Sequence, residues 1–287
     1  FALRPAPTVK LEESLVQEAS KIALATLAER SGEDKFSWHS APSVLEEFTG
    51  REAFLSEVNE DWNDPKKHIA GLIGFGGEGK SSLARKWLDD LLNDSTQIQP
   101  DGLFWWGFYE DRSVDTFFEA ALEYMSGGKI DPKAIPSASM RAQVITSMLS
   151  SGRYLFVLDG LEVLQHQDGD QYGLFTSNDL RDFLNYFAAP DHESFCLITS
   201  RAPLLDLMEY TTYTHRDVNR LLLEDGIALL RRLGVNGNDE ELGVIVTDWD
   251  GHALTVSLLG SYLAEHHDGD ISRLEDIPFP TTNESRY

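Results

Sequence analysis

At residues 69–92 the chain reads Ile69-Ala-Gly-Leu-Ile-Gly-Phe-Gly-Gly-Glu-Gly-Lys-Ser-Ser-Leu-Ala-Arg-Lys-Trp-Leu-Asp-Asp-Leu-Leu92. Residues 69–74 are apolar or small, as in a buried strand, and residues 79–92 carry apolar side chains at helical spacing. Between these segments, Gly74 to Ser81 reads G-F-G-G-E-G-K-S, which matches the pattern G-x-x-x-x-G-K-[ST]. Because a strand and a helix flank the pattern as it requires, we predict a phosphate-binding loop.

The residue types of this loop suit an anionic ligand. Glycine has no Cβ, so backbone N–H groups can turn toward phosphate oxygens, and the following helix points its positive N-terminal end at the same anion. We expect Lys80 to reach the β- and γ-phosphates of a nucleotide and Ser81 to bind Mg²⁺. The other residues of this loop that we expect to bind the nucleotide are Gly74, Gly76, Gly77, Glu78, Gly79 and Ser82.

The composition indicates an acidic globular protein. The chain has 287 residues, 41% of them apolar, which suffices for one large α/β domain and a smaller one. Its 48 acidic and 24 basic residues give a formal net charge of −24, so we expect no direct binding of nucleic acid.

The sequence has no features of a secreted or membrane protein. Cys196 is the only cysteine, which excludes a disulfide framework within the chain, and no apolar run reaches the roughly 18 residues of a membrane span. We therefore expect a cytoplasmic protein without a membrane partner. Since the chain begins at Phe1 and ends in a polar tail at Tyr287, we also expect a fragment of a longer polypeptide.

Strand-like and helix-like segments alternate through the middle of the chain. Strands are predicted at residues 69–74, 103–109, 154–159, 195–200 and 213–216, and helices at 48–58, 79–92, 113–125, 138–150 and 178–188. This alternation is typical of an α/β fold, here with a five-stranded parallel sheet covered by helices on both faces.

The two ends of the chain differ from this middle part. Residues 9–30 have the spacing of an amphipathic helix, and residues 31–43 indicate a linker. After Arg216 only helices are predicted, at residues 218–233, 239–248, 253–266 and 271–276. We therefore predict three parts: a helix and linker at 1–43, a P-loop nucleotide-binding domain at 44–216, and a helical lid domain with a tail at 217–287.

Three polar residues follow predicted strands and can serve phosphoryl chemistry. Asp159 ends an apolar strand, where P-loop enzymes need an acid for Mg²⁺, and Glu162 is the nearest group that can orient a water toward the γ-phosphate. Arg201 follows another strand at the same sheet edge, where it can sense the γ-phosphate. The alternatives are a solvated surface carboxylate for Glu162 and an ion pair with Asp206 or Glu209 for Arg201.

In view of these residues, the chain resembles the bacterial STAND ATPases, the signal-transducing P-loop NTPases that include the NB-ARC and NACHT modules. The resemblance covers about residues 44–270 and rests on motifs that occur in the family's order. They are Phe48-Thr-Gly-Arg-Glu52, the phosphate-binding loop, Trp106-Gly-Phe-Tyr109, Leu158-Asp-Gly-Leu-Glu162, Ile198-Thr-Ser-Arg201 and Gly251-His-Ala-Leu254.

The resemblance implies further nucleotide contacts. Arg51 lies in the family's h-x-G-R-E motif, beside the adenine. Gly251, His252 and Ala253 match the G-x-P motif of the lid, with Ala253 where many members have proline. Many relatives also carry two adjacent acids after the metal-binding aspartate, whereas Gly160 follows Asp159 here.

We therefore expect an ATP/ADP-operated switch with Mg²⁺ as cofactor and slow ATP hydrolysis. The resemblance implies that it controls the oligomerisation of a bacterial signalling or antiviral defence protein, with self-association through flanking domains. One alternative is the ATPase module of a transcription regulator. If Arg201 is not the γ-phosphate sensor, Arg216 or an arginine of a neighbouring subunit is the next candidate. A small-molecule kinase is a further alternative, although no acceptor site is visible.

Overall fold

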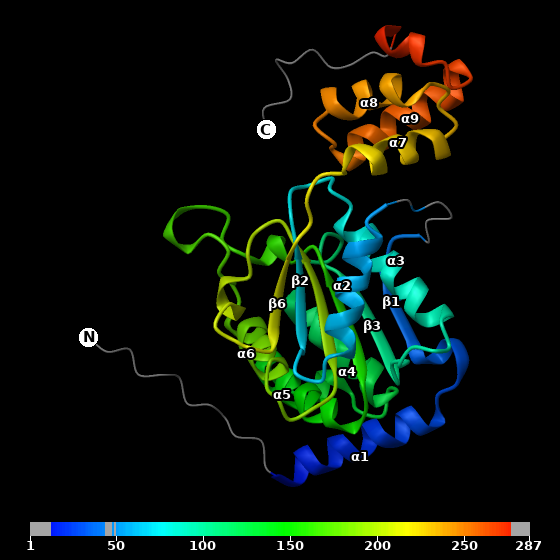
Figure 1. Cartoon of the computed structure of the whole chain (residues 1–287). Helices are drawn as coiled ribbons and strands as arrows, with labels where there is room; N and C mark the ends of the chain where they lie inside the picture. The colour runs from blue at the N-terminus through cyan, green and yellow to red at the C-terminus, as the bar shows by residue number, and fades with distance from the viewer. Residues whose placement is uncertain (1–12, 44–47, 49, 277–287) are drawn as a thin grey trace. The chain divides into compact units, whose positions relative to one another are not determined.

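The computed structural model describes residues 13–43, 48 and 50–276 (Figure 1). These residues form two compact units. The first, which we call the sheet unit, comprises residues 13–43, 56–74 and 80–217. The second, the helical unit, comprises residues 48, 50–55, 75–79 and 218–276.

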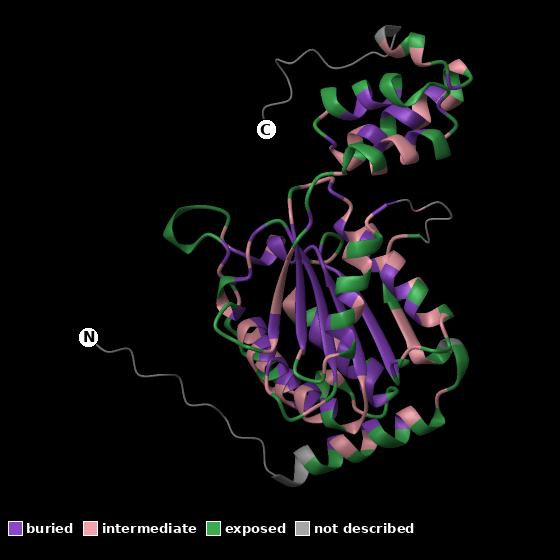
Figure 2. Ribbon diagram, viewed as in Figure 1, coloured by how far each residue is buried: buried purple, intermediate pink, exposed green. Residues whose placement is uncertain are grey.

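The sheet unit contains a six-stranded sheet of order β1-β3-β4-β5-β2-β6, in which all neighbouring strands are parallel. Strands β2 to β5 are buried along their whole length, which accounts for their continuous apolar sequences (Figure 2). The predicted α/β class is confirmed. The strands are β1 (Phe36–His39), β2 (Ile69–Ile73), β3 (Gly102–Gly107), β4 (Tyr154–Asp159), β5 (Phe195–Ser200) and β6 (Tyr213–Asp217).

Strand β1 corrects the predicted number of strands, because it lies in the segment 31–43 that was interpreted as a linker. It is four residues long, is partly exposed, and occupies the edge of the sheet beside β3. Trp38 of this strand packs near Trp105, with 6.2 Å between the ring centroids. A short edge strand needs no apolar run, so the sequence gives little signal for it.

Helices cover both faces of the sheet, as predicted. Figure 1 shows α2 (Glu52–Asn63) and α3 (Lys80–Asn93) on one face. On the other face lie α4 (Val114–Ser126), α5 (Ala138–Met148) and α6 (Asn178–Phe187). Aromatic side chains fill both layers: Trp62 meets Phe195 edge-on with centroids 5.8 Å apart, and Phe117 meets Phe183 at 5.7 Å.

Helix α1 (Glu13–Glu29) belongs to the sheet unit and packs against α4 and α5. The Thr26 hydroxyl donates to the Ser126 carbonyl oxygen at 3.0 Å, and the Ser20 hydroxyl donates to the Ser147 carbonyl oxygen at 2.8 Å. The predicted helix began at residue 9, and residues 9–12 lie outside the described part of the chain.

The helical unit contains α7 (Leu223–Arg232), α8 (Asp239–Asp248), α9 (Ala253–His267) and the 3-10 turn Ile271–Asp276. Helix α7 begins later than predicted, because residues 218–222 are not helical. No helix in the described residues is long and apolar enough to cross a membrane. The three α-helices enclose a small core of Leu230, Val235, Leu242, Ile245, Val246, Val256, Leu259 and Leu263.

Candidate functional site

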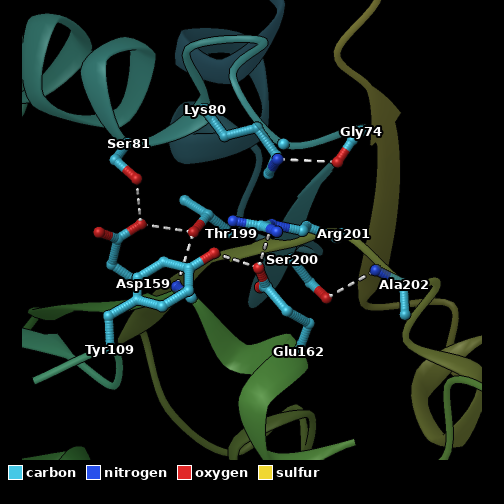
Figure 3. Close-up of polar contacts among 12 residues, drawn as sticks. Gly74, Lys80, Ser81, Tyr109, Asp159, Glu162, Thr199, Ser200, Arg201 and Ala202 are labelled. Atoms are coloured by element: carbon cyan, nitrogen blue, oxygen red, sulfur yellow. Dashed lines mark hydrogen bonds and ion pairs between the residues drawn. The ribbon is translucent and has the colours of Figure 1, made fainter. Parts of the chain in front are cut away.

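The carboxyl edge of the sheet brings together the predicted polar residues of the sheet unit (Figure 3). Strands β2 and β5 end at the same level, because Ile73 is in register with Ser200. Beside them β4 ends at Asp159. Lys80 and Ser81, which open α3, lie at this edge as well.

Asp159 is the buried centre of this group. Its Oδ1 accepts hydrogen bonds from the Ser81 hydroxyl, at 2.6 Å, and from the Thr199 hydroxyl. Burial raises the pKa of Asp159, and the two hydrogen bonds act in the opposite direction. The adjacent hydroxyl and carboxylate are hard oxygen donors of the kind that Mg²⁺ prefers.

Lys80 provides the buried positive charge of the site. Its Nζ donates to the Gly74 carbonyl oxygen at 2.7 Å, and the residue is 7% exposed. The first turn of α3 contains no acidic side chain that would oppose an anion there. Ser82 lies in the same turn and is half-buried.

Glu162 follows β4 in the 3-10 turn Leu161–Leu164 and is buried, with 5% of its surface exposed. The interpretation of Glu162 as a solvated surface carboxylate is therefore wrong. Its Oε1 accepts a hydrogen bond from the Tyr109 hydroxyl and lies 2.8 Å from Arg201 Nε. Its Oε2 is buried and accepts no hydrogen bond from the described residues.

Both candidate sensor arginines have acidic partners in the sheet unit. Arg201 pairs with Glu162, whereas Asp206, which the sequence offered as its alternative partner, pairs with Arg181 at 2.8 Å. Arg216 pairs with two acids of α2, Glu57 at 2.6 Å and Asp61 at 2.8 Å.

Tyr109 and Thr199 contact this group, and neither was predicted as a site residue. Tyr109 lies just beyond the carboxyl end of the aromatic strand β3, and Thr199 lies near the carboxyl end of the apolar strand β5. The sequence signal for both is thus a polar side chain at the end of a predicted strand. Thr199 also accepts a hydrogen bond from the Gly160 backbone N–H at 2.9 Å. It thereby fixes both the side chain of Asp159 and the turn that leads to Glu162.

Residues 75–79 of the phosphate-binding loop belong to the helical unit, where the start of α9 binds two of their carbonyl groups. His252 Nε2 lies 2.9 Å from the Gly76 carbonyl oxygen, and the Leu254 backbone N–H donates to the Gly77 carbonyl oxygen at 3.0 Å. Gly77 has φ +81°, and a Cβ there would lie 2.6 Å from His252 Cε1. The carbonyl groups of Gly76 and Gly77 thus have partners within the helical unit.

Arg51 and Glu78 form a second buried contact of the helical unit. Arg51, at φ +65°, donates from one guanidinium nitrogen to the Glu78 carbonyl oxygen at 2.5 Å and from the other to the Asn219 carbonyl oxygen at 2.6 Å. The Glu78 carboxylate is 1% exposed and lies 3.9 Å from Arg51 and 3.8 Å from Arg220. Burial lowers the pKa of Arg51, and the negative charges of Glu78 and Asp225 oppose this effect.

The residues matched to the lid motif lie at the start of α9. Gly251 has φ +64°, and a Cβ there would lie 2.5 Å from the Leu221 carbonyl oxygen. His252 is the N-cap of the helix and Ala253 its first residue. The structure thus places Gly251 to Ala253, Arg51 and the loop residues 75–79 in one unit.

Comparisons with known proteins identify the fold. No protein-family model matches the chain. An uncharacterized WD repeat-containing protein of Nostoc sp. is 23% identical over 250 residues, which are 84% of this chain and 20% of that protein. The chain thus spans about a fifth of the length of this curated relative.

Similar solved structures include ATPases. A STAND protein with a tetratricopeptide repeat sensor from Pyrococcus horikoshii has TM-score 0.50 at 20% identity, over 77% of this chain and 30% of that one. A Walker-type ATPase of Pyrococcus abyssi has TM-score 0.50 at 16% identity, over 82% and 73%. The Aeropyrum pernix ORC1 protein, solved with DNA, has TM-score 0.53 at 15% identity, over 81% and 66%. The chain therefore has the P-loop NTPase fold.

Proposed function

We propose that this chain is the nucleotide-binding core of an ATP/ADP-operated switch of the STAND type. The observation that carries the proposal is the arrangement of Lys80, Ser81, Asp159 and Glu162 at one edge of the sheet (Figure 3). It supplies a buried cation, two metal-binding oxygens and a buried carboxylate, which are the groups that phosphoryl transfer to water needs.

Ser81 and Asp159 would bind Mg²⁺ at this site. The described residues contain no group of three or more His, Cys, Asp or Glu side chains that could bind a metal alone. Mg²⁺ usually takes one or two protein ligands and completes its shell with phosphate oxygens and water. When bound, the ion would neutralise charge on the phosphates.

Glu162 would orient the attacking water, and Arg201 would respond to the γ-phosphate. Because Arg201 pairs with Glu162 in this structure, the carboxylate already has a positive partner, which is consistent with slow hydrolysis. An Arg201 that turns to the γ-phosphate would leave Glu162 with the Tyr109 hydroxyl alone. The chain would thereby couple the presence of the γ-phosphate to its chemistry.

The switch would act in the cytoplasm as part of a larger signalling or defence protein that self-associates. The likeness to a STAND protein and to a WD repeat-containing protein supports the larger size of the whole protein, because each is several times longer than the matched segment. The net charge of −24 disfavours direct contact with nucleic acid.

Calorimetric titration with ATP and ADP tests the proposal. In Lys80→Ala we expect no measurable binding of either nucleotide, because a methyl group cannot offset phosphate charge in an acidic protein. Lys86→Ala is the matched control, since Lys86 lies on the same helix and pairs with Asp90. Equal affinities of the wild type and Lys80→Ala would refute the proposed site.

A further inference from the structure

The contact between Tyr109 and Glu162 points to a positioning residue at the sheet edge. We propose that the Tyr109 hydroxyl orients the Glu162 carboxylate so that Oε2 faces the attacking water. This inference rests on the proposed ATPase function and extends it to a residue that does not itself touch the nucleotide.

The two oxygens of Glu162 have different surroundings. Oε1 accepts the Tyr109 hydroxyl and lies 2.8 Å from Arg201 Nε, so its lone pairs are occupied. Oε2 is buried and accepts nothing from the described residues. Because a buried carboxylate oxygen without a partner is costly, Oε2 is the atom that needs a water.

Tyr109 can donate to Glu162 throughout the neutral pH range. Burial raises the pKa of the Tyr109 phenol, and the hydrogen bond to Glu162 raises it further. The hydroxyl therefore keeps its proton and can donate it in a hydrogen bond. Its role toward the Glu162 carboxylate is to fix one oxygen in place.

The backbone around Tyr109 is shaped for this contact. The Phe108 N–H donates to the Asp159 carbonyl oxygen at 2.8 Å, which joins the end of β3 to the end of β4. Gly160 has φ +76°, and a Cβ there would lie 2.5 Å from Tyr109 Cε2. The absence of a side chain at Gly160 therefore allows the ring to lie over the turn between Asp159 and Glu162.

Tyr109→Phe removes the hydroxyl and keeps the ring, so it isolates the hydrogen bond. Tyr124→Phe is the matched control, since the Tyr124 hydroxyl also donates to an oxygen of the sheet unit, the Lys35 carbonyl oxygen at 2.7 Å. We would measure single-turnover ATP hydrolysis, ATP and ADP affinity by calorimetry, and thermal unfolding. The same measurements on Glu162→Gln and on the double variant Tyr109→Phe/Glu162→Gln complete a mutant cycle.

We expect Tyr109→Phe to slow hydrolysis about 10-fold to 100-fold, the range that one hydrogen bond to a charged group implies. ATP and ADP affinities should stay within about twofold of the wild type, Tyr124→Phe should hydrolyse ATP at the wild-type rate, and Tyr109→Phe should have no further effect in the Glu162→Gln background.

An unchanged or increased rate in Tyr109→Phe, or an equal loss in both backgrounds, would overturn the positioning role while the proposed function stands. A wild-type chain that binds ATP without hydrolysing it would also overturn the role. If the wild type binds no ATP, the proposed function fails, and the positioning role fails with it.

Discussion

The Arg201 guanidinium lies beside a buried carboxylate, yet 56% of its side chain is exposed. An exposed cation can change partners at little cost in solvation, whereas the buried Glu162 cannot leave its place. Arg201 is therefore the group of this pair that can move toward a γ-phosphate. ADP lacks that phosphate and offers Arg201 no comparable partner.

Replacing Arg201 by alanine should weaken ATP binding by about 1–3 kcal/mol, the value of a charge-assisted contact. ADP affinity should stay within about twofold of the wild type, because ADP lacks the γ-phosphate. The Tyr109 hydroxyl also still binds Glu162 in this variant. Calorimetry with both nucleotides measures the difference, with Arg112→Ala as a control for an exposed arginine on the loop after β3. Equal losses for ATP and ADP would exclude a γ-phosphate sensor at this position.

Local patterns in the sequence predicted the residues that stand next to strand ends. Lys80, Ser81 and Asp159 needed only the loop pattern and an apolar strand that ends in an acid. The contact of Tyr109 with Glu162 joins residues 53 positions apart and depends on the pairing of β3 with β4. No local pattern carries that information, so the partner of Glu162 emerged only from the structure.

Helix α9 orients part of the phosphate-binding loop through its first turn. The helix begins at Ala253, and its N-cap His252 accepts a hydrogen bond at Nδ1 from the Thr255 backbone N–H at 3.4 Å. With Nδ1 as acceptor, Nε2 carries the hydrogen and donates to the Gly76 carbonyl oxygen. One imidazole thus caps a helix and binds a carbonyl group of the loop.

Two substitutions at His252 separate these tasks. Serine can cap the helix but is too short to reach Gly76, whereas alanine can do neither. Both variants should bind ATP and ADP more weakly by a similar factor, since the loop serves phosphates that the nucleotides share. His252→Ala should also lose about 0.5–2 kcal/mol of stability in the helical unit, which denaturant unfolding followed by circular dichroism would measure.

The loop contact of His252 would be refuted if His252→Ser bound both nucleotides as tightly as the wild type. It would also be refuted if only ATP binding fell, because the Gly76 carbonyl cannot distinguish the two nucleotides. His266→Ala is the matched control, since His266 lies in the last turn of the same helix.

Helices and strands with a strong apolar periodicity in their own sequence were predictable. Elements that form through contacts with neighbouring elements were not. The buried strands β2 to β5 and the amphipathic α3 follow from their own sequences. The edge strand β1 exists because β3 offers it hydrogen bonds along the edge. The start of α7 at Leu223, five residues after the predicted start at 218, follows the extended segment in which the Leu221 N–H donates to the Gly251 carbonyl oxygen at 2.9 Å.

For the whole molecule, a net charge of −24 opposes the binding of a polyanionic nucleotide. Lys80 compensates only part of the phosphate charge. A divalent cation that neutralises more of this charge should therefore have a large effect on nucleotide binding. A switch further requires that ATP and ADP stabilise two states to different degrees, because a ligand with equal affinity for both shifts nothing. The stability of the protein toward unfolding, measured with and without Mg²⁺, is thus the relevant measurement for the whole molecule.

We expect Mg²⁺ and ATP together to raise the unfolding temperature by about 5–10 °C at a hundredfold excess over Kd, as a stabilisation of about 2.7 kcal/mol implies. Chelation by EDTA should remove most of this increase. Asp159→Ala should lose only the Mg²⁺-dependent part, because the carboxylate that would bind the metal is gone while Lys80 remains. Asp170→Ala is the control, since Asp170 is exposed on the loop after the Glu162 turn. The same Mg²⁺-dependent increase in Asp159→Ala as in the wild type would place the metal elsewhere.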